Sequence, residues 1–504
     1  MMTLYKSTKG VSLQYLVDGL TDKVFDDDLY ISGLSMDSRK IRAGYLFIAC
    51  KGLFDSGLKY IQDAIDAGAC AILVDNETNH KDKIQNTPLI DIDNLRGKVG
   101  IISSRFYGYP SNDLNIVGIT GTNGKTSVSY FIAQVLSEYR GNICGLIGTL
   151  GYGPYNKLEA GQNTTPDSVT LQHNLVKIRD AGATDLAMEV SSCGLEQGRI
   201  AEVGFNIAVF TNLSSDHLDC HGDMQAYADA KRKLFSVDGL QHAVININDD
   251  FGKILATEIK DRLHVIEYKL VDSFSDTKKA NQILATVLEH EIDFLSLEIK
   301  SPWGNGYLQV AIGGKYNAEN LLACLAVLCL LDLPFDKVLK GLSRISGVPG
   351  RMESLGGNGN TSIFVDYAHT PDALEKALST LHQYCIGELI CVFGCGGGRD
   401  KSKRAVMGGI AEQHSDKIIL TNDNPRTEDP QSIIDDILVG IDKTKSVFVE
   451  QNREQAIIKA IELAGNNDVV LIAGKGHETY QEISGICYPF SDRQFVRNYL
   501  KADR

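Results

Sequence analysis

Residues 118–126 form a strand-to-helix turn whose composition suits the binding of nucleotide phosphates. They read G-I-T-G-T-N-G-K-T, and glycines let backbone N–H groups point at an anion beside the positive end of a helix. Lys125 is placed to reach terminal phosphates, and the Thr126 hydroxyl to bind magnesium. The full Walker pattern has glycine where this chain has Ile119, so a chance glycine–lysine turn stays open as the alternative. We call residues 118–126 the phosphate loop.

Two polar groups follow apolar runs further along the chain. Glu189 lies in M-E-V-S-S, at the expected carboxyl end of a buried strand, where a carboxylate can bind magnesium, a cation that prefers oxygen ligands. The alternative is a strand-end glutamate in a local ion pair. His217, in T-N-L-S-S-D-H-L-D, is either a metal ligand or a helix-capping or solvated residue.

Lys231 lies in an expected helix, beside the small side chains of Ala228 and Ala230. By default such a lysine is a solvated surface charge. The alternative is that its neutral amine captures carbon dioxide, because the resulting carbamate is an anion able to bind magnesium. The residues alone favour the surface interpretation.

Two loops near the C-terminus carry charged groups suited to a zwitterion. Residues 394–404 combine three consecutive glycines with Arg399, Lys401, Lys403 and Arg404, which suits phosphate or carboxylate binding. In T-N-D-N-P-R, Asp423 can bind an amine and Arg426 a carboxylate. The alternatives are a flexible basic surface loop and a plain Asn-Pro turn.

Alternating strands and helices are expected to position these groups. Short apolar runs predict strands at residues 45–49, 71–74, 186–190, 208–211, 243–247, 362–365, 389–393, 417–420 and 469–473. Helical patterns near residues 60–67 and 317–331 fit crossover helices, so we expect an α/β fold with parallel sheets. Ligands of such sheets bind outside the carboxyl ends of the strands.

Turn-rich segments predict three domains. G-Y-P-S-N at residues 108–112 and G-V-P-G at residues 347–350 are typical of linkers. We therefore expect domains at residues 1–109, 110–346 and 347–504.

Bulk composition restricts the class of protein. The chain has 504 residues and a net charge of −14, which argues against nucleic-acid or membrane-surface binding. Its eleven cysteines have no C-x-x-C spacing and fit reduced core thiols. The longest apolar stretch, residues 321–331, is too short to span a bilayer. We expect a soluble cytoplasmic protein without membrane insertion.

Eleven ordered motifs resemble those of the Mur ligase family, over nearly the whole chain. The family's phosphate loop has the same shortened form. The motifs are G-T-N-G-K-T, N-T-T-P-D, M-E-V-S-S, T-N-L-S-S-D-H-L-D, Y-A-D-A-K, N-A-E-N, G-R-M-E, V-D-Y-A-H-T-P-D, F-G-C-G-G-G-R-D, D-N-P-R and G-K-G-H-E.

The resemblance implies an ATP-dependent amide ligase of peptidoglycan precursor synthesis. It implies a small N-terminal α/β domain for the uridine nucleotide, a central P-loop ATPase domain with a parallel sheet, and a Rossmann-like C-terminal domain for the amino acid. The D-N-P-R form goes with addition of meso-2,6-diaminopimelate to UDP-N-acetylmuramoyl-L-alanyl-D-glutamate through an acyl phosphate. The same ligation with L-lysine is the closest alternative, and a non-catalytic nucleotide-binding switch is the alternative of a different class.

The resemblance also implies site residues. ATP-binding positions are Gly121, Thr122, Asn123, Gly124, Lys125, Thr126, Ser127, Asn317, Asn320, Arg351 and Asp366. Positions that contact the UDP substrate are Met36, Ser38, Leu53, Phe54, Asp55, Asn163, Thr164, Thr165, Ser191, Gln197 and Arg199. Diaminopimelate-binding positions are Arg399, Asp423, Asn424, Pro425, Arg426, Gly474 and Glu478.

The implied catalytic residues are Lys125, Glu189, His217 and Lys231, and the implied magnesium ligands are Thr126, Glu189, His217 and the carbamate of Lys231. This reverses the default interpretation of Lys231. The implied cofactor is Mg²⁺, with ATP as co-substrate. The expected partners are small-molecule substrates only, bound by a monomer.

Overall fold

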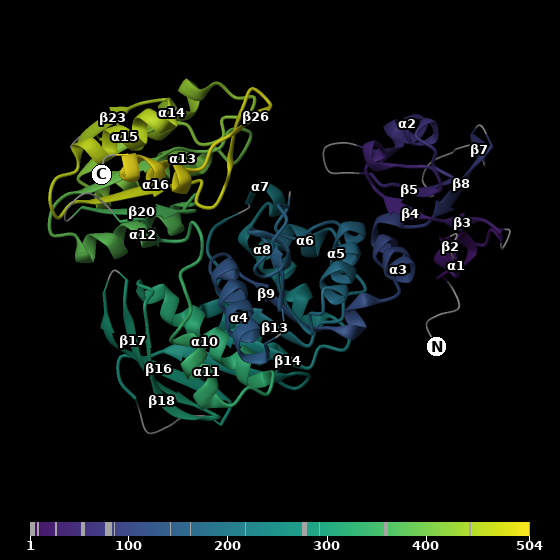
Figure 1. Ribbon diagram of the computed structural model, residues 1–504, viewed down its shortest axis with the longest axis horizontal. Helices are drawn as coiled ribbons and strands as arrows, with labels where there is room; N and C mark the ends of the chain where they lie inside the picture. The colour runs from purple at the N-terminus through teal and green to yellow at the C-terminus, as the bar shows by residue number, and fades with distance from the viewer. Residues whose placement is uncertain are drawn as a thin grey trace. The chain divides into compact units, whose positions relative to one another are not determined.

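The computed structural model describes residues 6–7, 10–25, 28–51, 56–75, 83–84, 86–141, 143–161, 163–216, 218–274, 280–291, 293–356, 361–442 and 445–502. The chain divides into two compact units. The first comprises residues 1–120, 140–208 and 230–241, and the second comprises residues 121–139, 209–229 and 242–504. Figure 1 follows the elements along the chain.

The N-terminal part of the first unit is a sheet with the order β4-β5-β6-β8-β7 (Figure 1). The first four of these strands run parallel, and β7 runs antiparallel to β8. Side chains of β5 alternate between the faces: Leu46 and Ile48 pack with α1 and α3, and Phe47 and Ala49 pack with α2. A small sheet, β1-β2-β3, precedes it. The bounds are β1 Lys6–Ser7, β2 Gly10–Ser12, β3 Tyr30–Ile31, β4 Gly33–Ser35, β5 Tyr45–Ala49, β6 Ala71–Asp75, β7 Lys83–Ile84, β8 Thr87–Ile92, α1 Leu13–Val17, α2 Ile61–Asp66 and α3 Leu95–Tyr107.

The first unit also contains the strand that leads into the phosphate loop. In the order β11-β10-β12-β9, strands β10, β12 and β9 are parallel, and β11 is antiparallel to β10. Helix α5 starts at an aspartate cap, where the Asp167 carboxylate accepts hydrogen bonds from the N–H groups of Val169 and Thr170. The bounds are β9 Asn115–Thr120, β10 Gly145–Gly148, β11 Gly151–Pro154, β12 Asp185–Glu189, α5 Ser168–Asp180 and α6 Ser192–Glu196. Strand β13 (Ile207–Phe210) and helix α8 (Met224–Arg232) cross the boundary between the units.

The second unit continues with the order β14-β15-β16-β17-β18, which is parallel through β16 and antiparallel afterwards. Helix α10 is the helix expected near residues 317–331. A further helix, α11, follows it and was missed. The bounds are α4 Lys125–Arg140, α7 Leu218–His221, β14 His242–Asn246, α9 Asp250–Ile259, β15 His264–Leu270, β16 Gln282–His290, β17 Leu295–Ser301, β18 Gly304–Val310, α10 Lys315–Leu330 and α11 Phe335–Leu342.

The C-terminal part of the second unit is a six-stranded sheet, β19-β20-β24-β21-β22-β23, in which only β19 is antiparallel. Helices α12, α13 and α14 cover one face, and α15 and α16 cover the other (Figure 1). The strands are therefore apolar on both faces. The bounds are β19 Glu353–Ser354, β20 Ser362–Asp366, β21 Leu389–Phe393, β22 Lys417–Leu420, β23 Ser446–Val449, β24 Val469–Ala473, β25 Tyr480–Ile483, β26 Ile486–Pro489, α12 Pro371–Tyr384, α13 Ser402–His414, α14 Pro430–Leu438, α15 Arg453–Leu463 and α16 Asp492–Ala502.

The predicted α/β class with parallel sheets is confirmed, and each predicted strand lies within one residue of an observed strand. Among the described residues, no helix has the length and apolar character needed to cross a membrane.

Candidate active site

Two glycines shape the phosphate loop between β9 and α4. The φ angles of Gly121 and Gly124 are +149° and +86°, a region that favours glycine. A Cβ at Gly121 would lie 1.9 Å from Thr211 Oγ1, and one at Gly124 would lie 2.5 Å from Asn320 Oδ1. Both positions therefore require glycine for backbone conformation and for space.

Neutral polar groups from the segment after β13 hold the loop in place. The Thr122 N–H donates to the backbone oxygen of Asn212 at 2.8 Å, and the Asn123 N–H donates to Oδ1 of Asn212 at 2.9 Å. The Thr211 hydroxyl donates to Asn123 O at 2.6 Å, and Ser214 N donates to Thr122 Oγ1 at 3.0 Å. No role had been predicted for Thr211, Asn212 or Ser214 from the sequence.

Lys125 and Thr126 begin helix α4, as expected. The Lys125 ammonium donates to the carbonyl oxygens of Gly121 and Thr122, at 2.7 and 2.8 Å. Arg351 donates through Nη2 to the Thr126 hydroxyl at 3.1 Å. The next residue, Ser127, is buried in the first turn of α4. The structure thus brings the predicted residue Arg351 to the phosphate loop.

Two predicted asparagines lie on α10. Asn320 donates through Nδ2 to Asn317 Oδ1 at 3.0 Å, and Asn317 donates to Gly313 O at 2.7 Å. These bonds aim Asn320 Oδ1 at the place where a Gly124 side chain would be. Both predicted asparagines therefore lie beside the loop.

Asp366 ends β20 and accepts hydrogen bonds from the N–H groups of Met352 and Ala368, at 2.6 and 2.7 Å. Burial raises the pKa of this carboxyl, and Arg351 opposes the rise. The Arg351 guanidinium lies 4.4 Å from the ring centre of Tyr367, so an arginine already positioned by a cation–π contact reaches Thr126. A further residue, Asp372, was missed: its carboxylate accepts from Asn123 Nδ2 at 2.6 Å.

Glu189 is 1 % exposed and ends β12, as predicted. Its two carboxylate oxygens accept from the N–H and hydroxyl groups of Thr149, at 2.8 and 3.1 Å. A Cβ at Gly148 would lie 2.2 Å from this carboxylate, so glycine makes room for it. A buried carboxylate fixed through both oxygens is the kind of donor that a hard cation prefers.

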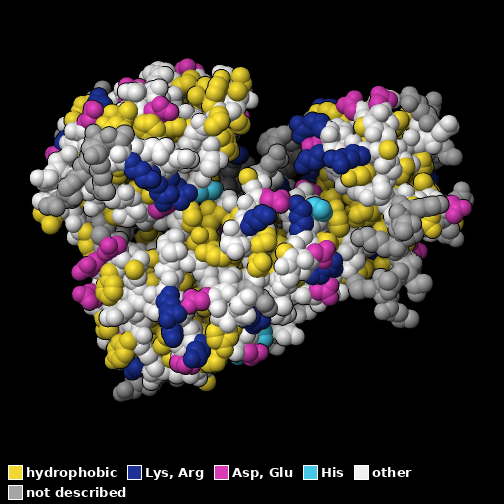
Figure 2. Space-filling view, viewed as in Figure 1, with side chains coloured by type: hydrophobic (Ala, Val, Ile, Leu, Met, Phe, Trp, Pro, Cys, Tyr) yellow, Lys and Arg dark blue, Asp and Glu magenta, His cyan; other side chains and the backbone are white. Residues whose placement is uncertain are grey.

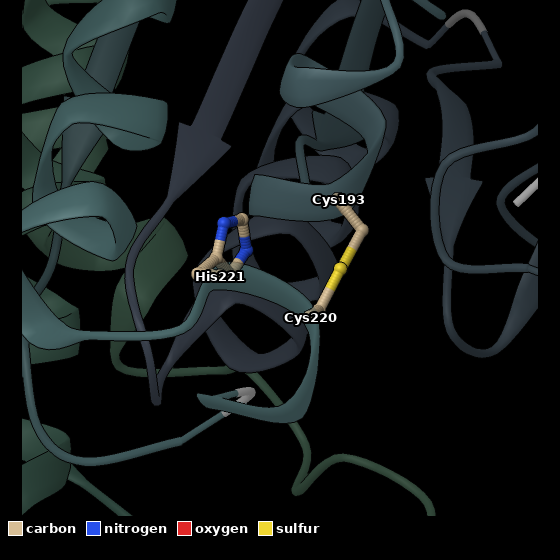
Figure 3. A group of neighbouring side chains, drawn as sticks. All are labelled: Cys193, Cys220 and His221. Atoms are coloured by element: carbon tan, nitrogen blue, oxygen red, sulfur yellow. The ribbon is translucent and has the colours of Figure 1, made fainter.

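Lys231 is 1 % exposed in α8. Its default interpretation as a solvated surface lysine is therefore wrong, and small neighbours such as Ala230 leave room for the buried side chain. The predicted metal ligand His217 lies outside the described residues. The following helix, α7, ends with Cys220 and His221, which Figure 3 draws together with Cys193 of α6.

Residues predicted to contact the UDP substrate gather around the end of β12. The Thr165 hydroxyl donates to Glu189 O and accepts from Ser191 N, both at 2.9 Å. Arg199 donates to Thr165 O at 2.6 Å and to Gln197 Oε1 at 2.8 Å. Burial lowers the pKa of the Arg199 guanidinium.

Two more predicted residues lie close to the same group. The Thr164 and Thr149 hydroxyls are 3.2 Å apart, and Asn163 O accepts from the Tyr152 hydroxyl. In the N-terminal part of the unit, Met36 and Ser38 follow β4 and are half-buried. Figure 2 shows Lys and Arg side chains gathered over the part of the molecule that holds β4 and β5. The predicted residues Leu53, Phe54 and Asp55 lie outside the described residues.

Three loops leave the carboxyl ends of β21, β22 and β24, and we call them the edge loops: residues 394–399, 421–426 and 474–478. Their backbones pack together closely. A Cβ at Gly394 would lie 2.0 Å from Thr421 O, one at Gly397 2.0 Å from Pro425 O, and one at Gly474 2.6 Å from Asp423 Oδ2. These three glycines are thus close-packing positions.

The edge loops bring together all predicted amino-acid-binding residues. Arg426 has a φ of +55°, donates to Gly397 O at 2.8 Å and pairs with Glu482 at 3.3 Å. A Cβ at Gly396 would lie 2.9 Å from Arg426 Nη1 and 3.8 Å from Cγ of Arg399. The guanidinium groups of Arg399 and Arg426 therefore belong to neighbouring loops.

The other basic residues of segment 394–404 do not form an anion site. Arg404 is fully buried and pairs with Glu428 and Asp436, at 2.9 and 2.8 Å. Lys401 also pairs with Glu428, and Lys403 donates to a backbone oxygen. Of the four basic residues, Arg399 alone makes no hydrogen bond or ion pair with another described residue. The prediction of four anion-binding groups was wrong, because three of them fix the loop.

Arg453, at the start of α15, is a residue that the sequence analysis missed. It is 2 % exposed and pairs with Asp492 at 2.7 Å, and it donates to Ala473 O at 2.9 Å and to Asn422 O at 3.3 Å. One buried cation therefore ties the ends of β24 and β22 to α16. A lone arginine in a helix gives no sequence signal for this role.

Three family models match the chain. They are the Mur ligase family catalytic domain at residues 30–107, the Mur ligase middle domain at residues 119–328, and the Mur ligase glutamate ligase domain at residues 350–476. Together they cover the N-terminal sheet, the phosphate loop from residue 119, the first two edge loops and residues 474–476 of the third.

Relatives match over nearly the full length. A protein of Coxiella burnetii named UDP-N-acetylmuramoyl-L-alanyl-D-glutamate–2,6-diaminopimelate ligase is 46% identical over 97% of this chain and 100% of its own. The protein of the same name from Pseudomonas aeruginosa is 45% identical over 94% of this chain and 96% of its own.

Solved structures are similar to this chain as well. A structure of a 2,6-diaminopimelate ligase of that name aligns with a TM-score of 0.66 and 33% identity, over 98% of this chain and 99% of its own. A MurF structure from Acinetobacter baumannii, at 16% identity, shares the fold with a TM-score of 0.64 and 98% coverage of both chains. The chain belongs to the Mur ligase family.

Proposed function

We propose that this chain is the ATP-dependent ligase that joins meso-2,6-diaminopimelate to UDP-N-acetylmuramoyl-L-alanyl-D-glutamate in peptidoglycan precursor synthesis. The observation that carries the proposal is the pairing of a phosphate loop with edge loops that bear Arg399, Arg426, Asp423 and Glu478. Diaminopimelate has two amine–carboxylate centres, and each centre needs a cationic and an anionic partner. Relatives named as diaminopimelate ligases are 46% and 45% identical to this chain.

The reaction needs no nucleophilic side chain. The γ-carboxylate of the D-glutamyl residue attacks the terminal phosphorus of ATP, and ADP leaves. The neutral amine of diaminopimelate then attacks the carbonyl carbon of the acyl phosphate, phosphate leaves through a tetrahedral intermediate, and the amine proton passes to solvent or a base. Positioning and electrostatic stabilisation supply the rate enhancement.

Residues of the phosphate loop bind the nucleotide. Backbone N–H groups of Gly121, Gly124 and Ser127, together with the Lys125 ammonium, hold the phosphates. Thr122 and Asn123 form the same loop, with their own N–H groups bonded to Asn212. Arg351 reaches the same loop through Thr126 and is suited to neutralise charge that develops on the transferred phosphoryl group. Asn317 and Asn320 contact the adenine side, and Asp366 holds Arg351 and the backbone after β20 in place.

Mg²⁺ suits the donors that the predicted ligands offer. The Glu189 carboxylate and the Thr126 hydroxyl would supply oxygens, His217 would be a third ligand, and a carbamate on Lys231 would add two oxygens to a buried side chain. When bound, the ion neutralises phosphate charge. The burial of Lys231 supports the carbamate, because the side chain is not a solvated surface charge and a carbamate formed on its neutral amine would place two oxygen donors in the protein interior.

The remaining predicted residues bind the other substrates. Residues 1–109 form the uridine-nucleotide domain, with Met36, Ser38, Leu53, Phe54 and Asp55 as contacts. Residues 110–346 form the ATP domain, whose cluster at the end of β12 contacts the sugar and the dipeptide through Asn163, Thr164, Thr165, Ser191, Gln197 and Arg199. Residues 347–504 form the amino-acid domain. The protein acts in the cytoplasm as a monomer, on small molecules alone.

L-Lysine is the second candidate amino acid. It lacks the distal carboxylate, so Arg399 and Arg426 would face no anion on it. The combination of two arginines on neighbouring edge loops therefore favours diaminopimelate.

The proposal is tested by following phosphate release and product formation with the UDP-dipeptide. Phosphate release should depend on diaminopimelate and match the UDP-tripeptide formed. Robust phosphate release without an amino acid, and no tripeptide, would refute the ligase. The carbamate is tested with Lys231→Ala: activity should be lost and partly restored by a short carboxylic acid. A fully active variant that is insensitive to carbon dioxide would contradict it.

A further inference from the structure

Lys475 is a buried cation at the start of the third edge loop, one residue after Gly474. Its side chain is 0 % exposed, and its Nζ lies 2.8 Å from Glu478 Oε2 and 3.0 Å from Asn424 Oδ1. A buried ammonium is stable only when it is paired. Both of its partners belong to the proposed amino-acid site, whereas Lys475 has no role there so far.

The three side chains form a closed network. Asn424 donates through Nδ2 to Glu478 Oε2 at 2.8 Å, the oxygen that also accepts from Lys475. The Glu482 N–H donates to Asn424 Oδ1 at 2.9 Å. Since Oδ1 already faces two donors, the orientation of the Asn424 amide is fixed.

The network also determines which oxygen Glu478 can offer. Its Oε2 accepts two hydrogen bonds, whereas its Oε1 accepts none from the described residues. The side chain of Glu478 is 18% exposed, so Oε1 is the oxygen available to a substrate ammonium. Lys475 therefore orients the Glu478 carboxylate, although its own side chain is buried and not exposed to the substrate.

We propose that Lys475 is a positioning and specificity-determining residue of the amino-acid site. It orients Asn424 and Glu478 and supplies one positive charge that favours a diamino diacid over a diamino monoacid. This inference rests on the proposed function, because it concerns the same edge loops.

The net charge of the site explains why it favours a diamino diacid over a diamino monoacid. The edge loops and the adjoining strand β25 carry three cations, Arg399, Arg426 and Lys475, and three carboxylates, Asp423, Glu478 and Glu482. The site is therefore neutral, which matches diaminopimelate with its two ammonium and two carboxylate groups. Lysine has one carboxylate fewer and would leave an excess positive charge. Without Lys475 the site would be negative by one charge and would accept lysine better.

The test replaces Lys475 by methionine, which has a similar length and no charge. We expect Lys475→Met to raise the KM for diaminopimelate by about tenfold to a hundredfold, since hydrogen bonds to charged groups are worth that much. The ratio of kcat/KM for diaminopimelate to that for lysine should fall at least about tenfold. The KM for ATP should change by less than about twofold, because the phosphate loop keeps its contacts.

Lys417→Met is the matched control. Lys417 pairs with Glu388 at the opposite ends of the strands of the same sheet, so this variant should keep both KM values and the selectivity. A double-mutant cycle with Glu478→Gln adds a second measurement. If Lys475 acts through Glu478, the loss from Lys475→Met should be much smaller in the Glu478→Gln background than in the wild type.

Lys475→Gln, which keeps a donor but removes the charge, serves if the methionine variant does not fold, and its selectivity ratio should fall as well. If the wild-type protein selects diaminopimelate and the Lys475 variants keep the same KM and selectivity, the role of Lys475 is overturned and the proposed function is not. A wild-type protein that joins no amino acid would overturn the proposed function instead.

Discussion

The phosphate loop and the edge loops both leave the carboxyl ends of strands, yet different contacts hold them. Thr211, Asn212 and Ser214 hold the phosphate loop with neutral amide and hydroxyl groups. Buried ion pairs hold the edge loops: Arg404 with Glu428, Arg453 with Asp492, and Lys475 with Glu478.

The difference follows from what each region binds. Phosphates are bound by backbone N–H groups, so the loop needs only a fixed main chain and room for it. A zwitterion must be met by side-chain charges at fixed positions, and buried pairs hold such charges more rigidly than exposed ones. We therefore expect substitutions in the first region to affect catalysis with any amino acid, and substitutions in the second to affect stability or selectivity.

The largest effect is expected for Lys125→Ala. Loss of a cation that stabilises the transferred phosphoryl group should lower kcat about 10³- to 10⁵-fold, with diaminopimelate and lysine alike. Steady-state phosphate release measures this. Lys253→Ala is the control, since Lys253 pairs with Asp250 on the surface of α9. An equal loss of kcat in that variant would show that the effect of Lys125→Ala is not specific to the phosphate loop.

Arg453→Met should lower stability strongly. It leaves the carboxylate of Asp492, which is fully buried, without its cation, a change that costs about 3–5 kcal/mol. Hydrogen exchange of β24 amides reports the local free energy of unfolding. The control Arg497→Met removes an exposed cation from the same helix, α16, and should cost less than about 1 kcal/mol. Similar exchange rates in the two variants would mean that the Arg453–Asp492 pair does not stabilise β24.

Arg426→Ala should weaken diaminopimelate binding about a hundredfold, because the distal carboxylate loses a charged partner. The KM for diaminopimelate should rise, while the KM for ATP stays near that of the wild type and the turnover of lysine is kept or raised. Lys417→Ala removes a cation at the opposite ends of the strands of the same sheet and should change none of these constants. An unaltered KM for diaminopimelate in Arg426→Ala would remove this arginine from the site.

The smallest effect is expected for Glu428→Gln and depends on pH. Arg404, Lys401 and the Gly398 N–H hold the pKa of Glu428 well below its ordinary value of 4.5. The carboxylate therefore contributes stability above that value, and the contribution is lost as pH falls toward its pKa in the folded protein. At pH 7 the variant should be less stable by about 1–2 kcal/mol. Urea unfolding at several pH values should show this gap narrowing below about pH 4, and a constant gap would contradict it.

Sequence patterns predicted those strands that are short, unbroken apolar runs followed by a polar loop. Strands β5, β21, β22 and β24 have the predicted bounds. Motif residues such as Asp423 and Arg426 could be named because the carboxyl ends of parallel strands lie at one edge of a sheet.

What the sequence could not predict depends on burial and pairing. The sequence alone indicated that Lys231 is a surface charge and that Arg404 binds an anion. Both interpretations failed because a linear sequence does not show that these two side chains are buried. Arg453 pairs with Asp492, which lies 39 residues away, and no local pattern marks such a pair. Helix α11 and the antiparallel strands β17 and β18 were also missed. Strand β17 reads L-S-L-E-I-K-S, an apolar–polar alternation rather than the unbroken apolar run by which the other strands were predicted.

The most direct test of the account compares meso-diaminopimelate, L-lysine and L-ornithine as substrates of the wild-type protein, with ATP and the UDP-dipeptide at saturation. The account predicts one ADP, one phosphate and one UDP-tripeptide per diaminopimelate consumed. It also predicts a kcat/KM for diaminopimelate at least about a hundredfold above that for either monocarboxylate. Equal use of lysine, or ATP hydrolysis without an amide product, would contradict it.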